Sequence, residues 1–159
     1  MPGGKTHLRI ELGLLGLMSA GGAVLWWQGT IGEKELGAFL GAYLFSSLFL
    51  SPDLDLWESQ ATRRWWIGRI LWYPYSKVFR HRRASHHLIL GPLTRIVYLG
   101  GLVLLGAWGW SRITHQRLLL PSLRTEILLP IIIGLYIPNQ VHIMTDRIWS
   151  KFRVLRHRH

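Results

Sequence analysis

Four apolar stretches, separated by segments of concentrated positive charge, constrain this chain more than any other feature. They cover residues 12–27, 36–50, 88–110 and 127–144. Apolar residues occupy 49% of the 159 positions, yet the formal net charge is +11. The apolar and basic residues must therefore lie in separate parts of the chain, which is typical of membrane proteins.

The tryptophans favour a membrane protein over the alternative, a soluble helical bundle with an apolar core. Four of them stand at ends of apolar stretches, where interfacial aromatic belts occur; they are Trp26, Trp27, Trp108 and Trp110. Residues 57–80 mix aromatic residues with arginines, which suits a helix in the headgroup layer, or else a lid on the helix ends. We expect an all-α fold: an integral membrane bundle of about four helices, with an amphipathic interfacial segment between helices two and three.

The basic residues predict how such a bundle is oriented. With four spans, both termini and residues 51–95 share one side, and that side holds fifteen of the 19 lysines and arginines. Because such residues accumulate on the cytoplasmic side, the termini should be cytoplasmic, as in a protein of the bacterial inner membrane. The length fits a single domain over residues 1–159, ending in a basic tail at 147–159.

Seven histidines and aspartates fall on this same side and are candidate metal ligands. They are His7, Asp53, Asp55, His81, His86, His142 and Asp146. The chain has no cysteine, so a metal would be held by imidazole and carboxylate groups.

The aspartate pair follows Pro52, where the second apolar helix should end. A divalent ion would relieve the repulsion between Asp53 and Asp55. Alternatively, the two carboxylates cap the next helix or pair with Arg63 or Arg64.

The histidines at 81 and 86 lie in a basic cluster, in which His87 is an alternate to His86. The cluster is either part of a metal site or a loop that faces phosphate or lipid. His142 and Asp146 are four residues apart and share one helical face, which suits two ligands, a ligand with a supporting carboxylate, or a local hydrogen bond.

Taken together and in order, three motifs carry a family resemblance: Pro-Asp-x-Asp at 52–55, His-Arg-x-x-Ser-His at 81–86 and His-x-x-x-Asp at 142–146. The chain resembles the bacterial membrane-bound metal-dependent hydrolases, and more closely a sibling group of metal-binding proteins common in cyanobacteria. The resemblance implies a helical fold related to zinc phospholipases C and zinc nucleases, with the seven candidates as ligands. Leu8 departs from it, because the sibling group usually has aspartate there.

These observations predict a divalent-metal-dependent hydrolase that cleaves a lipid or lipid-linked phosphate ester at the cytoplasmic face. Two ions would share the ligands, and Arg82 or Arg83 would bind the phosphate. Zinc is the first expectation, although manganese and iron accept the same ligands. The alternative is a non-catalytic metal-binding membrane scaffold or assembly protein. We expect membrane lipids as partners and no nucleic acid, because the basic residues follow membrane topology.

Overall fold

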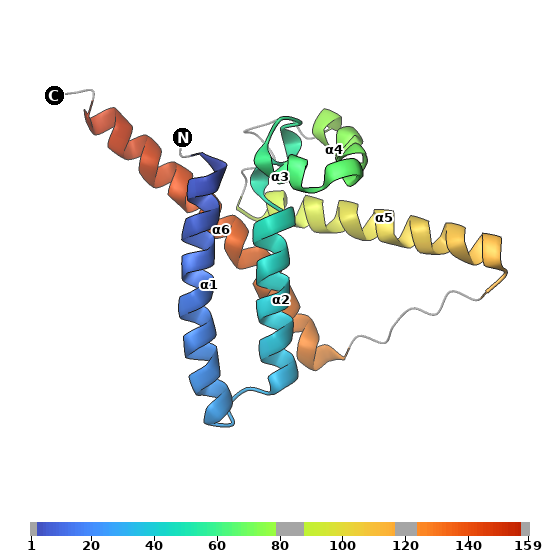
Figure 1. The fold of residues 1–159 in the computed structure, drawn as a ribbon, viewed down its shortest axis with the longest axis horizontal. Coiled ribbons are helices and arrows are strands. Elements are labelled where there is room, and N and C mark those ends of the chain that lie inside the picture. Colours follow the sequence, from blue (N-terminus) through green and yellow to red (C-terminus); the bar gives the residue numbers. More distant parts are fainter. Residues whose placement is uncertain (1–2, 79–87, 117–123, 157–159) are drawn as a thin grey trace.

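The structure is a computed structural model that describes residues 3–78, 88–116 and 124–156, and every regular element within these ranges is helical. These ranges contain six α-helices and two short 3₁₀-helices, and Figure 1 labels the α-helices. In chain order the elements are α1 (Gly4–Trp27), α2 (Glu33–Phe49), η1 (Pro52–Asp55), α3 (Gln60–Arg64), η2 (Trp66–Trp72), α4 (Tyr73–Val78), α5 (Leu90–Thr114) and α6 (Thr125–Arg156). The all-helical prediction is confirmed.

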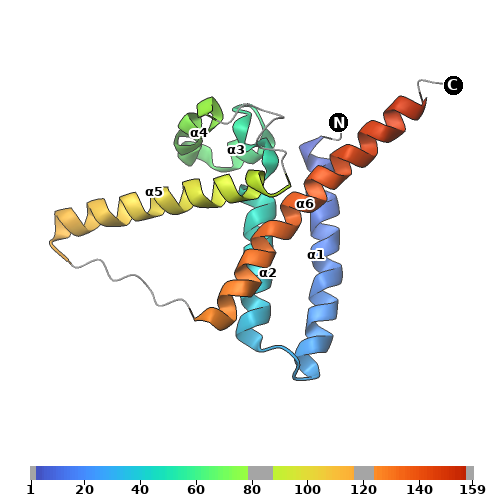
Figure 2. The ribbon, with the colours of Figure 1, turned by 180° about the vertical axis from the view of Figure 1, so that it is seen from behind.

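The four apolar stretches correspond to the four long helices α1, α2, α5 and α6. A short turn joins α1 and α2, which lie side by side in Figures 1 and 2. Gly29 in this turn has a φ of 71°, a conformation that glycine adopts without steric cost. At the start of α2, the backbone N–H of Gly32 donates to Glu35 Oε2 at 2.8 Å. This bond satisfies one of the unpaired donors of a helix N-terminus.

Three of these helices are long and apolar enough to cross a membrane: α1, α5, and Thr125–Lys151 within α6. Their side chains are largely exposed, as at Leu17 (73%) and Val103 (63%), which is consistent with a membrane protein. The expected count of about four spans is not confirmed. With 17 residues, α2 is shorter than the roughly 20 that a span requires.

The closest packing joins α2 and α6, which cross obliquely (Figure 2). A Cβ added to Gly134 would lie 2.6 Å from the carbonyl oxygen of Phe39, so glycine permits this approach. Polar bonds connect the same pair of helices. Ser46 Oγ donates to the Leu135 carbonyl at 2.7 Å, and Asn139 Nδ2 donates to Ser46 Oγ at 3.0 Å.

In contrast, α5 projects away from α1 and α2 in both ribbon views. Its buried residues, Gly91, Pro92 and Arg95, all lie in its first two turns. In the next turn, the Tyr98 hydroxyl donates to the Leu71 carbonyl. Helix α5 therefore does not run alongside the other long helices as a simple four-helix bundle would require.

The short elements η1, α3, η2 and α4 form a cap beside the ends of the long helices (Figure 1). Its core consists of Leu50, Leu54, Ala61, Trp72 and Tyr75. Apolar side chains also point outward from the cap, including Trp66 (79% exposed) and Ile67 (69%). This arrangement agrees with an amphipathic segment, and its placement in the headgroup layer stays a prediction.

Candidate metal centre

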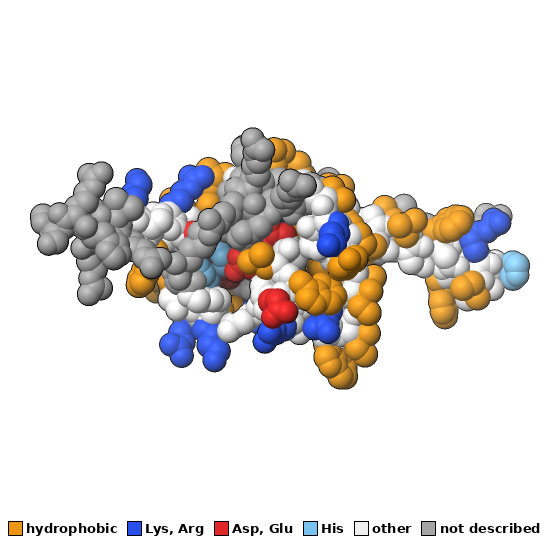
Figure 3. Space-filling view, turned by 90° about the horizontal axis from the view of Figure 1, so that it is seen from above, with side chains coloured by type: hydrophobic (Ala, Val, Ile, Leu, Met, Phe, Trp, Pro, Cys, Tyr) orange, Lys and Arg blue, Asp and Glu red, His pale blue; other side chains and the backbone are white. Residues whose placement is uncertain are grey.

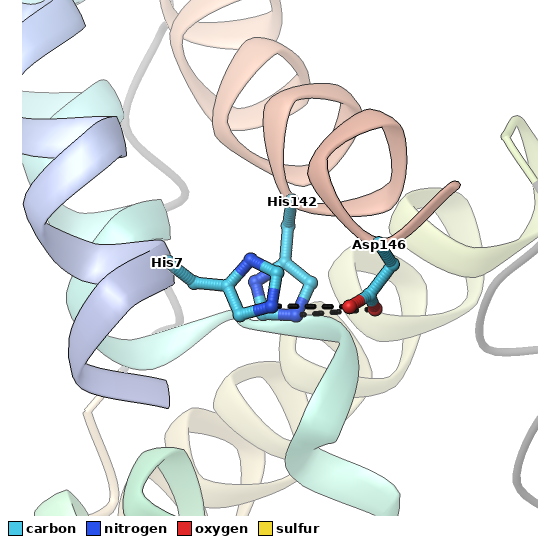
Figure 4. A group of neighbouring side chains, drawn as sticks. All are labelled: His7, His142 and Asp146. Carbon is cyan, nitrogen blue, oxygen red and sulfur yellow. Dashed lines mark ion pairs between the residues drawn. The ribbon is translucent and has the colours of Figure 1, made fainter. Parts of the chain in front are cut away.

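The centre begins with two histidines and an aspartate from opposite ends of the chain. His7 lies in α1, and His142 and Asp146 lie one turn apart in α6. All three are buried, and each offers a ligand atom within 4.8 Å of the others. Figure 4 shows the three side chains pointing toward one another.

The two imidazole rings are stacked, with centroids 3.8 Å apart and planes inclined by 13°. Both present Nε2 to the same carboxyl group. His7 Nε2 lies 3.1 Å from Asp146 Oδ1, and His142 Nε2 lies 4.0 Å from Asp146 Oδ2. One carboxylate therefore faces two imidazoles, each through a different oxygen.

Asp53 reaches the same cluster from η1. Its Oδ2 lies 3.6 Å from His142 Nε2, and its side chain is 25% exposed. Ser51 and Pro52 shape the turn that brings it there. Ser51 Oγ accepts the backbone N–H of Asp53 at 3.4 Å, and Pro52 occupies the first position of the 3₁₀-helix, where a missing N–H costs nothing.

Glu11 supports His142 from behind, and the sequence analysis did not identify it as a site residue. Its Oε1 lies 3.2 Å from His142 Nδ1. A carboxylate in this position accepts the Nδ1 hydrogen and leaves the Nε2 lone pair for a ligand role, as in many metal-bound histidines. The buried residues of α1 are His7 and Glu11 alone. Their spacing of four residues in an apolar helix is the signal that could have revealed Glu11.

Buried Arg95 connects the surrounding elements. It is fully buried, and its Nη1 donates both to the Leu50 carbonyl at 2.6 Å and to Asn139 Oδ1. Leu50 precedes residues 51–55, which form the aspartate loop, and Asn139 is one turn before His142 on α6. Asp55 is buried at 7% exposure and interacts electrostatically with Arg95.

The residues present fit a metal ion. Donor atoms about 2.0–2.2 Å from a common ion lie at most about 4.4 Å apart, and the nitrogen-to-oxygen distances of 3.1, 3.6 and 4.0 Å fall within that limit. In addition, His7 Nδ1 is buried without a hydrogen-bond partner among the described residues. Buried carboxylates need a compensating positive charge, which a metal ion would supply.

The remaining predicted site residues, His81, His86, Arg82 and Arg83, lie at 79–87, outside the described residues.

Viewed from above, acidic and histidine side chains gather near the middle of one face, with lysines and arginines at its edges (Figure 3).

Comparison with known proteins identifies the family. No solved structure matches the chain. An uncharacterized protein of Aquifex aeolicus is 44% identical over 57 residues, which is 36% of this chain and 40% of that relative. The chain thus matches less than half the length of this relative. The model of a metal-binding family matches residues 2–156. Because this match covers nearly every residue, the chain belongs to the family described as uncharacterized metal-binding protein (DUF2227).

Proposed function

We propose that this protein is a divalent-metal-dependent hydrolase that cleaves a lipid or lipid-linked phosphate ester at the cytoplasmic face of a membrane. Family membership and the His/Asp cluster make it a metal-binding protein with a candidate site. The proposal adds the activity, the substrate class, zinc as the first metal, and the kinship with membrane-bound hydrolases. Its ligand set is the one predicted from sequence.

The observation that carries the proposal is the Asp146 carboxylate facing two stacked imidazoles. The rings lie 3.8 Å apart with planes inclined by 13°, and each Nε2 lies near a different oxygen of Asp146. Hydrolytic two-metal sites hold their ions about 3.5–4 Å apart. A carboxylate that presents Oδ1 to His7 and Oδ2 to His142 could help to hold two such ions.

The described residues divide the work of such a site. His7, His142, Asp146 and Asp53 supply donor atoms, and Glu11 holds His142 in the orientation that frees Nε2. When bound, divalent ions would activate a water and hold a phosphoryl oxygen. Asp55, His81 and His86 complete the proposed ligand set, and Arg82 and Arg83 are proposed phosphate contacts.

The location of the cluster supports a site at a membrane surface. His7 is near the start of α1, Asp53 follows the end of α2, and α6 continues for almost three further turns beyond Asp146 to Arg156. All three lie at the end of the helices that carries both chain termini (Figure 1). Basic residues concentrate in these same segments, which favours the cytoplasmic side.

One observation favours a second candidate, a non-catalytic metal-binding scaffold. The side chains of His7 and Asp146 are only 3% and 10% exposed, and structural metal sites are typically closed to solvent. A metal at this point would join α1, η1 and α6, which are distant in sequence. The scaffold reading therefore uses the same ligands without an open coordination position.

Metal content is the first test. We would purify the protein in mild detergent and measure bound metals by mass spectrometry, comparing wild type with His142→Ala and Asp146→Ala. His115→Asn is the matched control, because His115 is an exposed histidine at the far end of α5 with a left-handed φ of 55°. We expect metal loss in the two centre variants alone. Equal metal content in all four proteins would refute the site.

Hydrolysis is the second test. The metal-loaded protein would be assayed with a chromogenic phosphodiester and with a short-chain phospholipid, in the presence of zinc, manganese or magnesium. Activity that disappears in Asp146→Ala and persists in His115→Asn would support the hydrolase. A fully metal-loaded protein that is inactive under all three conditions would favour the scaffold.

A further inference from the structure

A cavity of about 290 Å³ adjoins the metal centre. Its walls come from α1, the aspartate loop, α3 and α6, and they include His7, Glu11, Asp53 and His142. The volume is close to the lower end of ligand pockets, roughly 300–1,000 Å³. Because candidate metal ligands form part of its wall, any molecule in the cavity lies beside the metal centre.

Arg64 is the one lysine or arginine in the cavity wall among the described residues. Its Nη1 donates to the Leu48 carbonyl at 3.2 Å, and the neighbouring Trp65 Nε1 donates to the Phe49 carbonyl at 2.9 Å. Both acceptors belong to the last turn of α2, where helix carbonyls lack partners within the helix. The guanidinium is thus held at the wall by a single carbonyl, although it carries five N–H donors.

The charges around Arg64 determine what could bind there. Glu11, Asp53 and Glu58 also line the cavity, so its wall carries three carboxyl groups and one guanidinium. An anion would be repelled by this wall when the centre holds no metal. Divalent cations at His7, His142, Asp53 and Asp146 would reverse the sign of the local charge. Anion binding should therefore depend on bound metal.

We propose that this cavity is the phosphate subsite of the protein, and that Arg64 binds the phosphate oxygens as a fork once metal is bound. A guanidinium matches two phosphate oxygens through parallel N–H bonds, which lysine cannot reproduce. The inference rests on the proposed function. It adds Arg64 to the proposed phosphate contacts, which so far were Arg82 and Arg83.

Phosphate binding tests the subsite directly. We would measure binding of radiolabelled inorganic phosphate by equilibrium dialysis, using metal-loaded and metal-stripped protein in detergent. The variant is Arg64→Gln, and the matched control is Arg63→Gln. Arg63 is the preceding residue on α3, and its side chain is 64% exposed and paired with Glu58.

We expect metal-loaded wild type and Arg63→Gln to bind phosphate alike, and metal-stripped protein to bind far more weakly. Loss of hydrogen bonds to a charged group should weaken binding to Arg64→Gln by about 10- to 100-fold. Its metal content should remain that of wild type, which also shows that the variant is folded. Should Arg64→Gln lose metal, Arg64→Lys keeps the charge and should bind metal fully but phosphate more weakly than wild type.

The outcomes separate this inference from the proposed function. A wild-type protein that binds no metal refutes the proposed function itself. Full metal content with equal phosphate affinity in wild type, Arg64→Gln and Arg64→Lys overturns the subsite alone, as does phosphate binding that is independent of metal.

Competition by dihexanoyl phosphatidic acid identifies the source of the phosphate. Stronger competition than by inorganic phosphate supports a lipid headgroup, and equal competition supports a free phosphate group.

Discussion

Glu11→Gln offers the sharpest test of how the centre is organised. The substitution keeps the size of the side chain but removes its charge, next to the His142 nitrogen that is not aimed at Asp146. If Glu11 fixes the tautomer and orientation of His142, the variant should still bind metal, but less tightly. If Glu11 contributes nothing, the metal affinity should not change.

The expected magnitude follows from the contact distance. Replacing residues that support metal ligands commonly weakens metal binding by about 10- to 100-fold. The distance from Glu11 Oε1 to His142 Nδ1 is 3.2 Å, longer than the roughly 2.7–2.9 Å of a tight charge-assisted bond. Glutamine also keeps an acceptor oxygen. We therefore expect about a tenfold loss for Glu11→Gln, about 1.4 kcal/mol, and a larger loss for Glu11→Met, which has no acceptor oxygen.

Zinc affinity would be measured by competition with a chromogenic chelator, and stoichiometry by mass spectrometry. Glu33→Gln is the matched control, because Glu33 is an exposed carboxylate at the start of α2. An affinity for Glu11→Gln equal to that of the control would refute the supporting role. Loss of a whole equivalent of metal would also refute it, because that result makes Glu11 a ligand.

Three further results are expected from the packing, the charge distribution and the metal centre. Gly134→Ala should lower the free energy of unfolding by about 1–3 kcal/mol through overpacking, because the new Cβ would meet the Phe39 carbonyl at 2.6 Å. An unchanged thermal midpoint, measured by tryptophan fluorescence, would contradict this. Since the chain has no cysteine, Thr30→Cys and Ser150→Cys report sidedness. A membrane-impermeant maleimide should label intact bacterial cells at position 30 only, and labelling at position 150 would reverse the proposed topology. Removal of the metal by a chelator should lower the thermal midpoint. The lost stabilisation is about 2.7 kcal/mol if the free metal concentration was 100 times its Kd. An unchanged midpoint would show that the metal does not stabilise the fold.

The pair in α6 was accessible from sequence because its residues break an apolar pattern at helical spacing. His142 and Asp146 are polar residues one turn apart that follow a long apolar stretch of α6, where unpartnered polar groups are costly. His7 was predicted from its position on the same side as the other candidates and from the family resemblance, since a single histidine has no periodic context. The stacking of its ring on His142 depends on how α1 and α6 approach each other, which no local pattern encodes.

Glu11 illustrates a signal that the sequence contains but that is easily misread. In the sequence it interrupts an apolar run, and in the structure it is buried together with His7. For the aspartate pair, the sequence shows two adjacent candidates without distinguishing them. The 3₁₀ turn at Pro52–Asp55 brings Asp53 to within 3.6 Å of His142, and both aspartates interact electrostatically with Arg95. These contacts depend on a turn geometry and a buried cation that only the fold reveals.

The direction of α5 could not be predicted, because helix periodicity says nothing of where a helix points. Its first turns are held by Arg95, whose contacts with Leu50 and Asn139 join α5 to the aspartate loop and to α6. The described donor atoms of the metal centre all come from α1, η1 and α6, so α5 acts on the centre indirectly, through contacts such as those of this buried arginine. A buried cation left without these partners would be strongly destabilising. Arg95 therefore couples the docking of α5 to the shape of the metal centre.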